Sequence, residues 1–301
     1  MTIKNLVISG GGPIMIQILG AIQFLEKNKF LDMNNIETIY GTSAGAMIGL
    51  CLCLKFDWDT INDYIIKRPW QDVFSIKVEN IFDVYTRKGI FDIKTIEKCF
   101  KPLFDAKDIS IDINLEDLYK LSKIELHIFA FEINEYKTHD ISYLTHPKLS
   151  VLTAIQMSSA LPILITPVFL EDKCYIDGGV SCNYPLKYCI DSGKNIDDIL
   201  GFKVKYNNNN KNIIREESTI LDFLFYYLFK AIFSINIDSV QPSIKNEVLL
   251  DVNTSCVTFH MFHVLNSAED RKEWFNNGVK SSANLLTSLE YSIQELSESF
   301  L

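Results

Sequence analysis

The segment around Ser43 constrains the fold more than any other part of this sequence. A strand candidate at residues 36–40 is followed by Gly41-Thr42-Ser43-Ala44-Gly45 and then by an apolar run at 46–54 that predicts a buried helix. A serine on such a sharp strand-to-helix turn has its hydroxyl lifted clear of the sheet, and Gly41 and Gly45 avoid the collisions that a Cβ would cause there. The pattern indicates a nucleophile elbow with Ser43 as the nucleophile, against the alternative of a chance match in a loop.

The same order of elements opens the chain, where an apolar run at 6–8 is followed by three glycines and a helical pattern at 14–29. Strands that alternate with helices predict an α/β fold, a three-layer α/β/α sandwich with a mostly parallel central sheet. We expect a single domain over residues 1–301, of which 207–301 is the mainly helical C-terminal part. Residues 57–123 are predicted to be mainly helical, with helices at 91–100 and 115–121. Further helices are predicted at 151–160 and 269–297, strands at 126–131 and 199–206, a hairpin at 168–176 and a surface loop at 207–210.

Gly10, Gly11 and Gly12 form the second motif, between the first strand and the first helix. Backbone without side chains can direct several N–H groups at one point, as an oxyanion hole requires. A dinucleotide-binding turn would need a third glycine at position 15, which is Met15, and the phosphate-binding Gly-Lys-Ser/Thr pattern is missing as well. An ordinary loop that opens a helix remains the alternative.

Asp177-Gly178-Gly179 is the third motif, at the end of a predicted strand. A carboxylate on such a turn could take the serine proton as a general base. An ordinary aspartate, with a pKa of about 3.9, is a weak base for this purpose, so the site would have to raise its pKa by desolvation or use a short hydrogen bond. Taken alone, the motif is more typical of a simple Asp-Gly turn.

Together the three motifs resemble the patatin-like phospholipase family, which has a glycine-rich loop after its first strand, a Gly-x-Ser-x-Gly elbow and a later Asp-Gly-Gly or Asp-Gly-Ala motif. The resemblance covers residues 6–206 and extends to Ser158-Ser159-Ala160-Leu161-Pro162, Thr166-Pro167-Val168 and Asn183-Tyr184-Pro185. It implies a lipid acyl hydrolase, acting on phospholipids or related glycerolipids without calcium, whose Ser–Asp dyad of Ser43 and Asp177 needs no histidine. It also implies an oxyanion hole at Gly10, Gly11 and Gly12, and an acyl-enzyme formed on Ser43 that water cleaves.

One part of the glycine loop departs from the family pattern. The family continues with any residue, then Arg or Lys, then Gly, and this sequence has Pro13, Ile14 and Met15 there. The cation near the bound anion and the fourth glycine are therefore missing. This motivates a rival hypothesis, a non-catalytic lipid-binding protein that keeps the fold.

A second rival is an α/β-hydrolase esterase with a triad of Ser43, Asp177 and either His260 or His263, because that order of residues matches the triad order of that fold. Two points weigh against it. The elbow comes on the second strand, earlier than that fold places it, and the Asp-Gly-Gly motif is explained without a histidine.

Residues 221–233 are apolar and aromatic nearly all round. Such a helix is normally buried, so we expect burial, with a cap at Ser218 or Thr219. A helix that faces lipid or gates the site is the alternative.

Composition narrows the function classes. The net charge of −9 and the lack of a Lys/Arg run argue against nucleic acid and against electrostatic docking on anionic lipid, while transient membrane contact through apolar residues stays compatible. The seven cysteines include no pair of CxxC clusters, so neither a metal nor another cofactor is expected, and free thiols indicate a reducing compartment. Without a signal-peptide pattern or a membrane-length apolar stretch, we expect an intracellular, cytoplasmic protein. The oligomeric state stays open.

Overall fold

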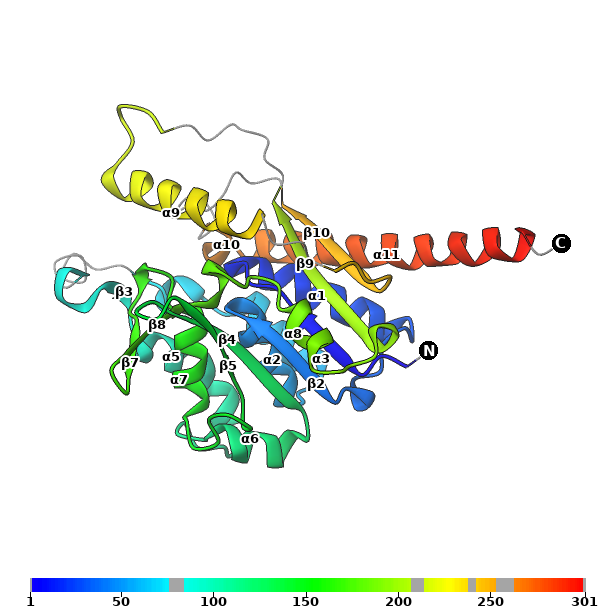
Figure 1. Ribbon diagram of the computed structural model, residues 1–301, viewed down its shortest axis with the longest axis horizontal. Helices are drawn as coiled ribbons and strands as arrows, with labels where there is room; N and C mark the ends of the chain where they lie inside the picture. Colours follow the sequence, from blue (N-terminus) through cyan, green and yellow to red (C-terminus); the bar gives the residue numbers. More distant parts are fainter. Residues whose placement is uncertain (1, 76–83, 207–213, 238–241, 253–262, 300–301) are drawn as a thin grey trace.

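The structure is a computed structural model that describes residues 2–75, 84–206, 214–237, 242–252 and 263–299 (Figure 1). Its strands are β1 (Asn5–Ile8), β2 (Thr38–Thr42), β3 (Gly89–Phe91), β4 (Glu125–Glu132), β5 (Lys137–Ile141), β6 (Ile163–Ile165), β7 (Val168–Leu170), β8 (Lys173–Asp177), β9 (Ile199–Tyr206) and β10 (Glu247–Val252). Its α-helices are α1 (Met15–Lys27), α2 (Ala44–Cys53), α3 (Trp58–Asn62), α5 (Ile93–Asp105), α6 (Leu115–Ser122), α7 (Val151–Ser159), α8 (Leu186–Asp191), α9 (Ile220–Ile237), α10 (His263–Asn266) and α11 (Ala268–Ser299).

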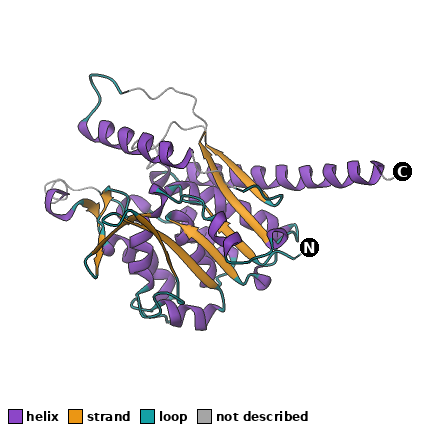
Figure 2. Ribbon diagram, in the orientation of Figure 1, coloured by secondary structure: helices purple, strands orange, loops and turns teal. Residues whose placement is uncertain are grey.

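A central sheet of order β10-β9-β1-β2-β4-β8-β7 organises the molecule, and β5 also pairs with β4. The strands β10, β9, β1, β2 and β4 are parallel to one another, whereas β8, β7 and β5 run antiparallel to their neighbours. Helices lie around this sheet (Figure 2). The mixed α/β architecture with a mostly parallel sheet confirms the predicted fold class.

The central strands are apolar on both faces, because each face packs against helices. Leu6 and Ile8 belong to the large core cluster that includes residues of α1 and α2. Val7, between them, belongs to a smaller cluster with Leu186 and Cys189 of α8, on the opposite face. A near-continuous apolar run is what a strand covered on both faces requires.

The observed boundaries differ from the predicted ones near Ser43. The second strand begins at Thr38 and continues to Thr42, and α2 begins at Ala44, so only Ser43 separates strand from helix. The segment predicted as mainly helical between 57 and 123 also contains β3, which pairs with β6 in a separate small sheet. The two segments approach each other closely there. A Cβ on Gly89 would lie only 2.4 Å from the Thr166 nitrogen. The loop predicted at 207–210 lies outside the described residues.

Helices α1 and α11 come together through two glycines. A Cβ on Gly20 would lie 2.2 Å from the carbonyl oxygen of Phe275, and a Cβ on Gly278 would lie 1.7 Å from that of Gln17. The two backbones can therefore approach this closely only where side chains are missing on both partners.

Helix α9 begins as predicted, but the prediction of burial is wrong for one of its sides. The hydroxyl of Thr219 accepts a hydrogen bond of 3.2 Å from the Asp222 N–H, which caps the helix start. Phe223 and Tyr227, by contrast, are half or more exposed, at 50% and 68%. Among the side chains of α9 that the structure describes, Leu228 and Ile232 pack on the core beneath the helix.

Candidate active site

Ser43 occupies a strained turn that its two glycine neighbours make sterically accessible. Its φ and ψ are 53° and −119°, a conformation that costs a non-glycine residue about 1–3 kcal/mol. A Cβ on Gly41 would lie 2.7 Å from the Gly45 carbonyl group, and a Cβ on Gly45 would lie 2.3 Å from the Ile8 oxygen. The predicted elbow geometry is therefore present, and both glycines are needed for it.

Ser158, a buried serine for which the sequence predicted no role, stabilises the backbone of the elbow. The Ser43 N–H donates a hydrogen bond of 2.8 Å to the Ser158 hydroxyl, which in turn donates one of 2.5 Å to the Phe129 carbonyl oxygen. Ser158 is fully buried on α7. The usable signal in the sequence is the pair Ser158 and Ser159 at the end of a largely apolar helix, because buried hydroxyls need partners.

The sheet register brings Asp177 to Ser43. Thr42 pairs with Phe129 on β4, and the next residue of β4, Ala130, pairs with Asp177 on β8. The Ser43 hydroxyl donates a hydrogen bond of 2.7 Å to Oδ2 of Asp177. The other carboxylate oxygen, Oδ1, accepts one of 2.7 Å from the Gly179 N–H.

Burial changes the acidity of Asp177, whose residue is only 7% exposed. Desolvation raises its pKa from 3.8 to about 6, and the hydrogen bonds from Ser43 and Gly179 only partly oppose that shift. Gly178 allows the turn to lie against β4, since a Cβ there would be 2.2 Å from the Phe129 oxygen. A carboxylate that has a raised pKa and is hydrogen-bonded to a serine hydroxyl can accept the proton of that hydroxyl.

The glycine loop lies beside Ser43. A Cβ on Gly10 would be 3.2 Å from the Ser43 Cβ and 2.6 Å from the side-chain oxygen of Asn183. Asn183 holds this loop, because its carbonyl oxygen accepts the Gly10 N–H at 3.0 Å and its side-chain amide donates to the Gly10 carbonyl at 3.3 Å. The Gly10 N–H is thus already engaged. Within the described part of the chain, the N–H groups of Gly11 and Gly12 have no protein acceptor, and Gly12 adopts a φ of 56°.

Ile14 stands where the family has a cation, and it belongs to the core. Its side chain has no exposed surface and lies against Gly11. Met15, the next residue, is partly buried and packs on the same core. The loop is therefore stabilised here by apolar packing and by Asn183, without a charge at position 14.

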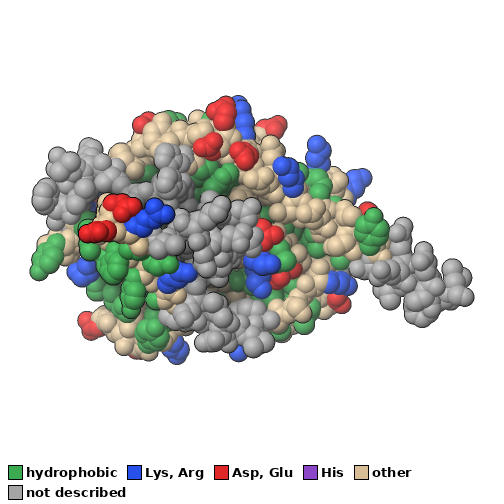
Figure 3. All heavy atoms as spheres, turned by 90° about the horizontal axis from the view of Figure 1, so that it is seen from above, with side chains coloured by type: hydrophobic (Ala, Val, Ile, Leu, Met, Phe, Trp, Pro, Cys, Tyr) green, Lys and Arg blue, Asp and Glu red, His purple; other side chains and the backbone are tan. Residues whose placement is uncertain are grey.

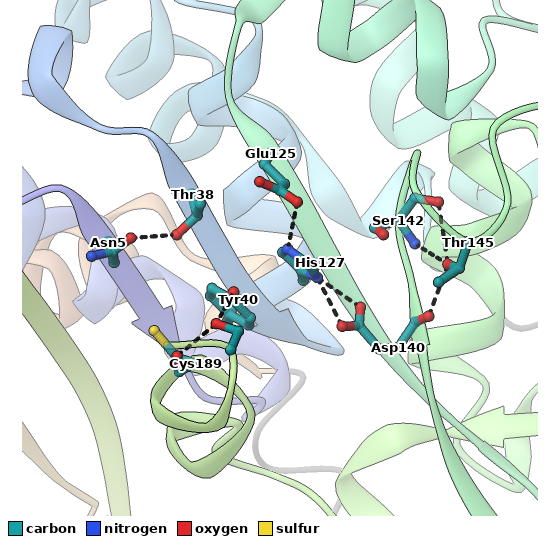
Figure 4. A network of polar contacts seen from close by, with 10 residues as sticks. Asn5, Thr38, Tyr40, Glu125, His127, Asp140, Ser142, Thr145 and Cys189 are labelled. Atoms are coloured by element: carbon teal, nitrogen blue, oxygen red, sulfur yellow. Dashed lines mark hydrogen bonds and ion pairs between the residues drawn. The ribbon is translucent and has the colours of Figure 1, made fainter. Parts of the chain in front are cut away.

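His127 is engaged with partners other than Ser43 and Asp177. His127 stacks on Tyr40 with 4.2 Å between ring centres, and its two nitrogens face Asp140 at 2.8 Å and Glu125 at 3.3 Å (Figure 4). Burial alone would lower the pKa of His127, but the two carboxylates raise it to about 9.

For the rival triad, His260 lies outside the described residues, as does the side chain of His263. A triad places an imidazole between the serine and the carboxylate. Here the hydroxyl of Ser43 contacts Asp177 directly, which is the arrangement expected for a dyad.

Among the described residues there is no group of three or more His, Cys, Asp or Glu side chains that could hold a metal ion. No helix within the described ranges has the length and apolar character needed to cross a membrane.

The structural class is defined by an α/β fold with a mostly parallel sheet and by a serine that lies beside a carboxylate on a strand–turn–helix elbow. The family model for patatin-like phospholipase matches residues 6–190. The chain therefore belongs to the patatin-like phospholipase family.

Two viral proteins and one bacterial structure are similar to this chain. A probable lipid hydrolase of Invertebrate iridescent virus 6 is 28% identical over 189 residues, and the match covers 62% of this chain but less than two thirds, 63%, of that protein. An uncharacterized protein of Acanthamoeba polyphaga mimivirus is 25% identical over 248 residues, which is 82% of this chain and 80% of that protein. Among solved structures, VipD from Legionella pneumophila shares the fold, with a TM-score of 0.56 and 19% identity over 96% of this chain and 67% of that chain.

Proposed function

We propose that this protein is a lipid acyl hydrolase that cleaves carboxylic esters of phospholipids or related glycerolipids through a Ser–Asp dyad. The observation that carries the proposal is the 2.7 Å hydrogen bond from the Ser43 hydroxyl to Asp177, at a turn where Ser43 has a φ of 53°. Membership of the patatin-like phospholipase family and the similarity to a probable lipid hydrolase support the substrate class.

The proposed reaction has two halves. As the Ser43 oxygen bonds to the ester carbonyl carbon, its proton moves to Asp177, and the C–O bond to the leaving alcohol then breaks as Asp177 returns that proton to the alcohol oxygen. Water next attacks the acyl-enzyme, again losing a proton to Asp177, and the Ser43 oxygen leaves with that proton. Fatty acid and free enzyme result, so the reaction needs no cofactor.

Negative charge develops on the carbonyl oxygen in both halves. The N–H groups of Gly11 and Gly12 are the donors that we assign to it, because the Gly10 N–H is bonded to Asn183. The N-terminus of α2, which begins at Ala44, adds the positive end of a helix dipole next to the nucleophile.

The pKa of Asp177 makes the proton transfer less unfavourable. An aspartate at its ordinary pKa would be a much weaker base than one whose pKa is about 6. The same burial that raises the pKa also strengthens the Ser43–Asp177 hydrogen bond, since the surrounding dielectric is low.

The test compares wild type with Ser43→Ala and Asp177→Asn on p-nitrophenyl esters and on phospholipid vesicles. We expect each variant to lose roughly a thousandfold or more in kcat, as is typical when a nucleophile or its base is removed. A fluorophosphonate probe should label wild type at Ser43, and a calcium chelator should leave the rate unchanged. Asp105→Asn, which removes a surface carboxylate paired with Lys101, is the matched control and should retain wild-type rates.

The alternatives predict other results. Equal rates from wild type, Ser43→Ala and Asp177→Asn would support the non-catalytic lipid-binding protein. A large loss on replacing His260 or His263 with alanine would support the triad.

A further inference from the structure

Helix α9 connects an exposed surface with the turn that follows Asp177. On its inner side, Ile232 belongs to an apolar cluster with Val180, which ends the short 3₁₀ turn Gly178–Val180, and Leu228 packs against that cluster. Ile176, directly before Asp177, belongs to the same apolar cluster. The inner side of α9 is thus fixed to the chain segment that carries the proposed base.

Another face of α9, next to the inner side, carries four apolar side chains that are open to solvent. Ile220, Phe223, Leu224 and Tyr227 are 69%, 50%, 37% and 68% exposed, and we call these four residues the outer stripe. Their spacing of three, four and seven places them on one face of the helix. On the surface seen in Figure 3, hydrophobic side chains gather over the part of the molecule where α9 begins.

We propose that the outer stripe docks the protein onto the surface of a zwitterionic lipid aggregate, next to the site that would hydrolyse it. This inference rests on the proposed function for the choice of lipid as the occupant. A contiguous exposed apolar stripe normally marks an interaction surface, and this one is attached directly to the Asp177 turn. A stripe of Ile, Phe, Leu and Tyr, with the exposed Lys230 at its edge, suits a helix that lies in the membrane interface.

The charges around the stripe favour neutral over anionic lipid. Asp222 and Lys230 are the charged residues of α9, so the helix itself carries no net charge. Asp222 is hydrogen-bonded to Thr219, and Lys230 lies 5.5 Å from the centre of the Tyr226 ring. The chain as a whole carries −9, which opposes approach to an anionic surface. Binding should therefore depend on apolar insertion and only weakly on salt.

The experiment uses the full chain and phosphatidylcholine vesicles. The stripe variant is Phe223→Asp with Tyr227→Asp. The matched control is Leu144→Asp with Tyr291→Asp, because Leu144 and Tyr291 are 61% and 64% exposed on other elements. We expect the stripe variant to lose roughly tenfold or more in vesicle affinity by cosedimentation and a similar factor in vesicle hydrolysis, while the control matches wild type. Both variants should hydrolyse a soluble p-nitrophenyl ester at the wild-type rate.

The readouts separate this inference from the proposed function. Vesicle binding without hydrolysis of any ester by wild type would contradict the hydrolase and leave the docking surface supported. Equal vesicle affinity for wild type and the stripe variant would overturn the docking surface even if both are active. Binding only to anionic vesicles with a steep salt dependence would overturn it too, as would a dimer that the stripe variant alone fails to form.

Discussion

The backbone N–H of Ser43 is bonded to the hydroxyl of Ser158, at 2.8 Å, and Ser158 has no exposed surface. A side chain from α7 therefore fixes the backbone of the residue whose hydroxyl faces Asp177. This bond also occupies the Ser43 N–H, so that group is not free to stabilise an oxyanion.

Replacing Ser158 with alanine should impair the positioning of Ser43 and leave substrate binding nearly unchanged. The change leaves the Ser43 N–H and the Phe129 carbonyl without their partner, which should cost about 1–3 kcal/mol in the free energy of unfolding. A shift of the elbow by a fraction of an ångström should lower kcat by roughly tenfold to a hundredfold, with KM nearly unchanged. Ser159→Ala is the control, because the Ser159 hydroxyl is buried and has no partner within the described part of the chain. Equal kcat values for the two variants would contradict the positioning role.

The rate should depend on pH through Asp177. The proposed base must be deprotonated, and burial raises its pKa to about 6. We therefore expect kcat/KM to fall below about pH 6 with a slope that approaches one proton, and to be flat above it. Initial rates on a soluble ester across the acid range measure this limb. A limb near the ordinary aspartate value, two pH units lower, would not fit a buried base.

The free energy of unfolding should also depend on pH through Asp177, but it should fall as pH rises, whereas the rate should increase. The folded pKa of Asp177 lies above its ordinary value of 3.8, so between that value and about 6 the folded state holds a proton that the unfolded state has lost. The free energy of unfolding contributed by this group therefore falls as pH rises through that window, and Asp177→Asn removes the loss. We expect the variant to gain about 2 kcal/mol over wild type on going from about pH 4 to about pH 7. Urea unfolding of both proteins at each pH tests this, and a difference that does not change with pH would contradict it.

Introducing the family's cation at position 14 should improve neither the stability nor the activity of the protein. Ile14 is fully buried, so Ile14→Arg would place a charge in the core and should cost about 3 kcal/mol or more in stability. Ile14→Met, which keeps volume and polarity, should cost less than about 1.5 kcal/mol. Urea midpoints and ester hydrolysis of the two variants measure the outcome. An Arg variant that is both stable and faster than wild type would contradict the buried role of Ile14.

The motifs whose residues are dictated by the local backbone conformation could be predicted from the sequence. Gly41, Gly45 and Gly178 sit where a Cβ would strike backbone atoms, and such positions leave a clear signal in the chain. The Ser158–Ser43 and Asn183–Gly10 contacts were not predicted, because they join residues 115 and 173 positions apart and depend on the sheet register. The exposed side of α9 was missed for a related reason. An all-apolar helix normally predicts burial, and only the tertiary packing decides which side remains open.

The position of β9 between β1 and β10 bears on how this protein can be divided for study. The family match ends at residue 190, before β9 begins at Ile199. A fragment cut there would leave β1, which leads into the glycine loop, as an open sheet edge available for pairing with other chains. The fragment would also lack α11, which packs against α1 at Gly20. The smallest piece worth expressing is therefore longer than the recognisable family segment, since the C-terminal third supplies the lateral support of the first strand.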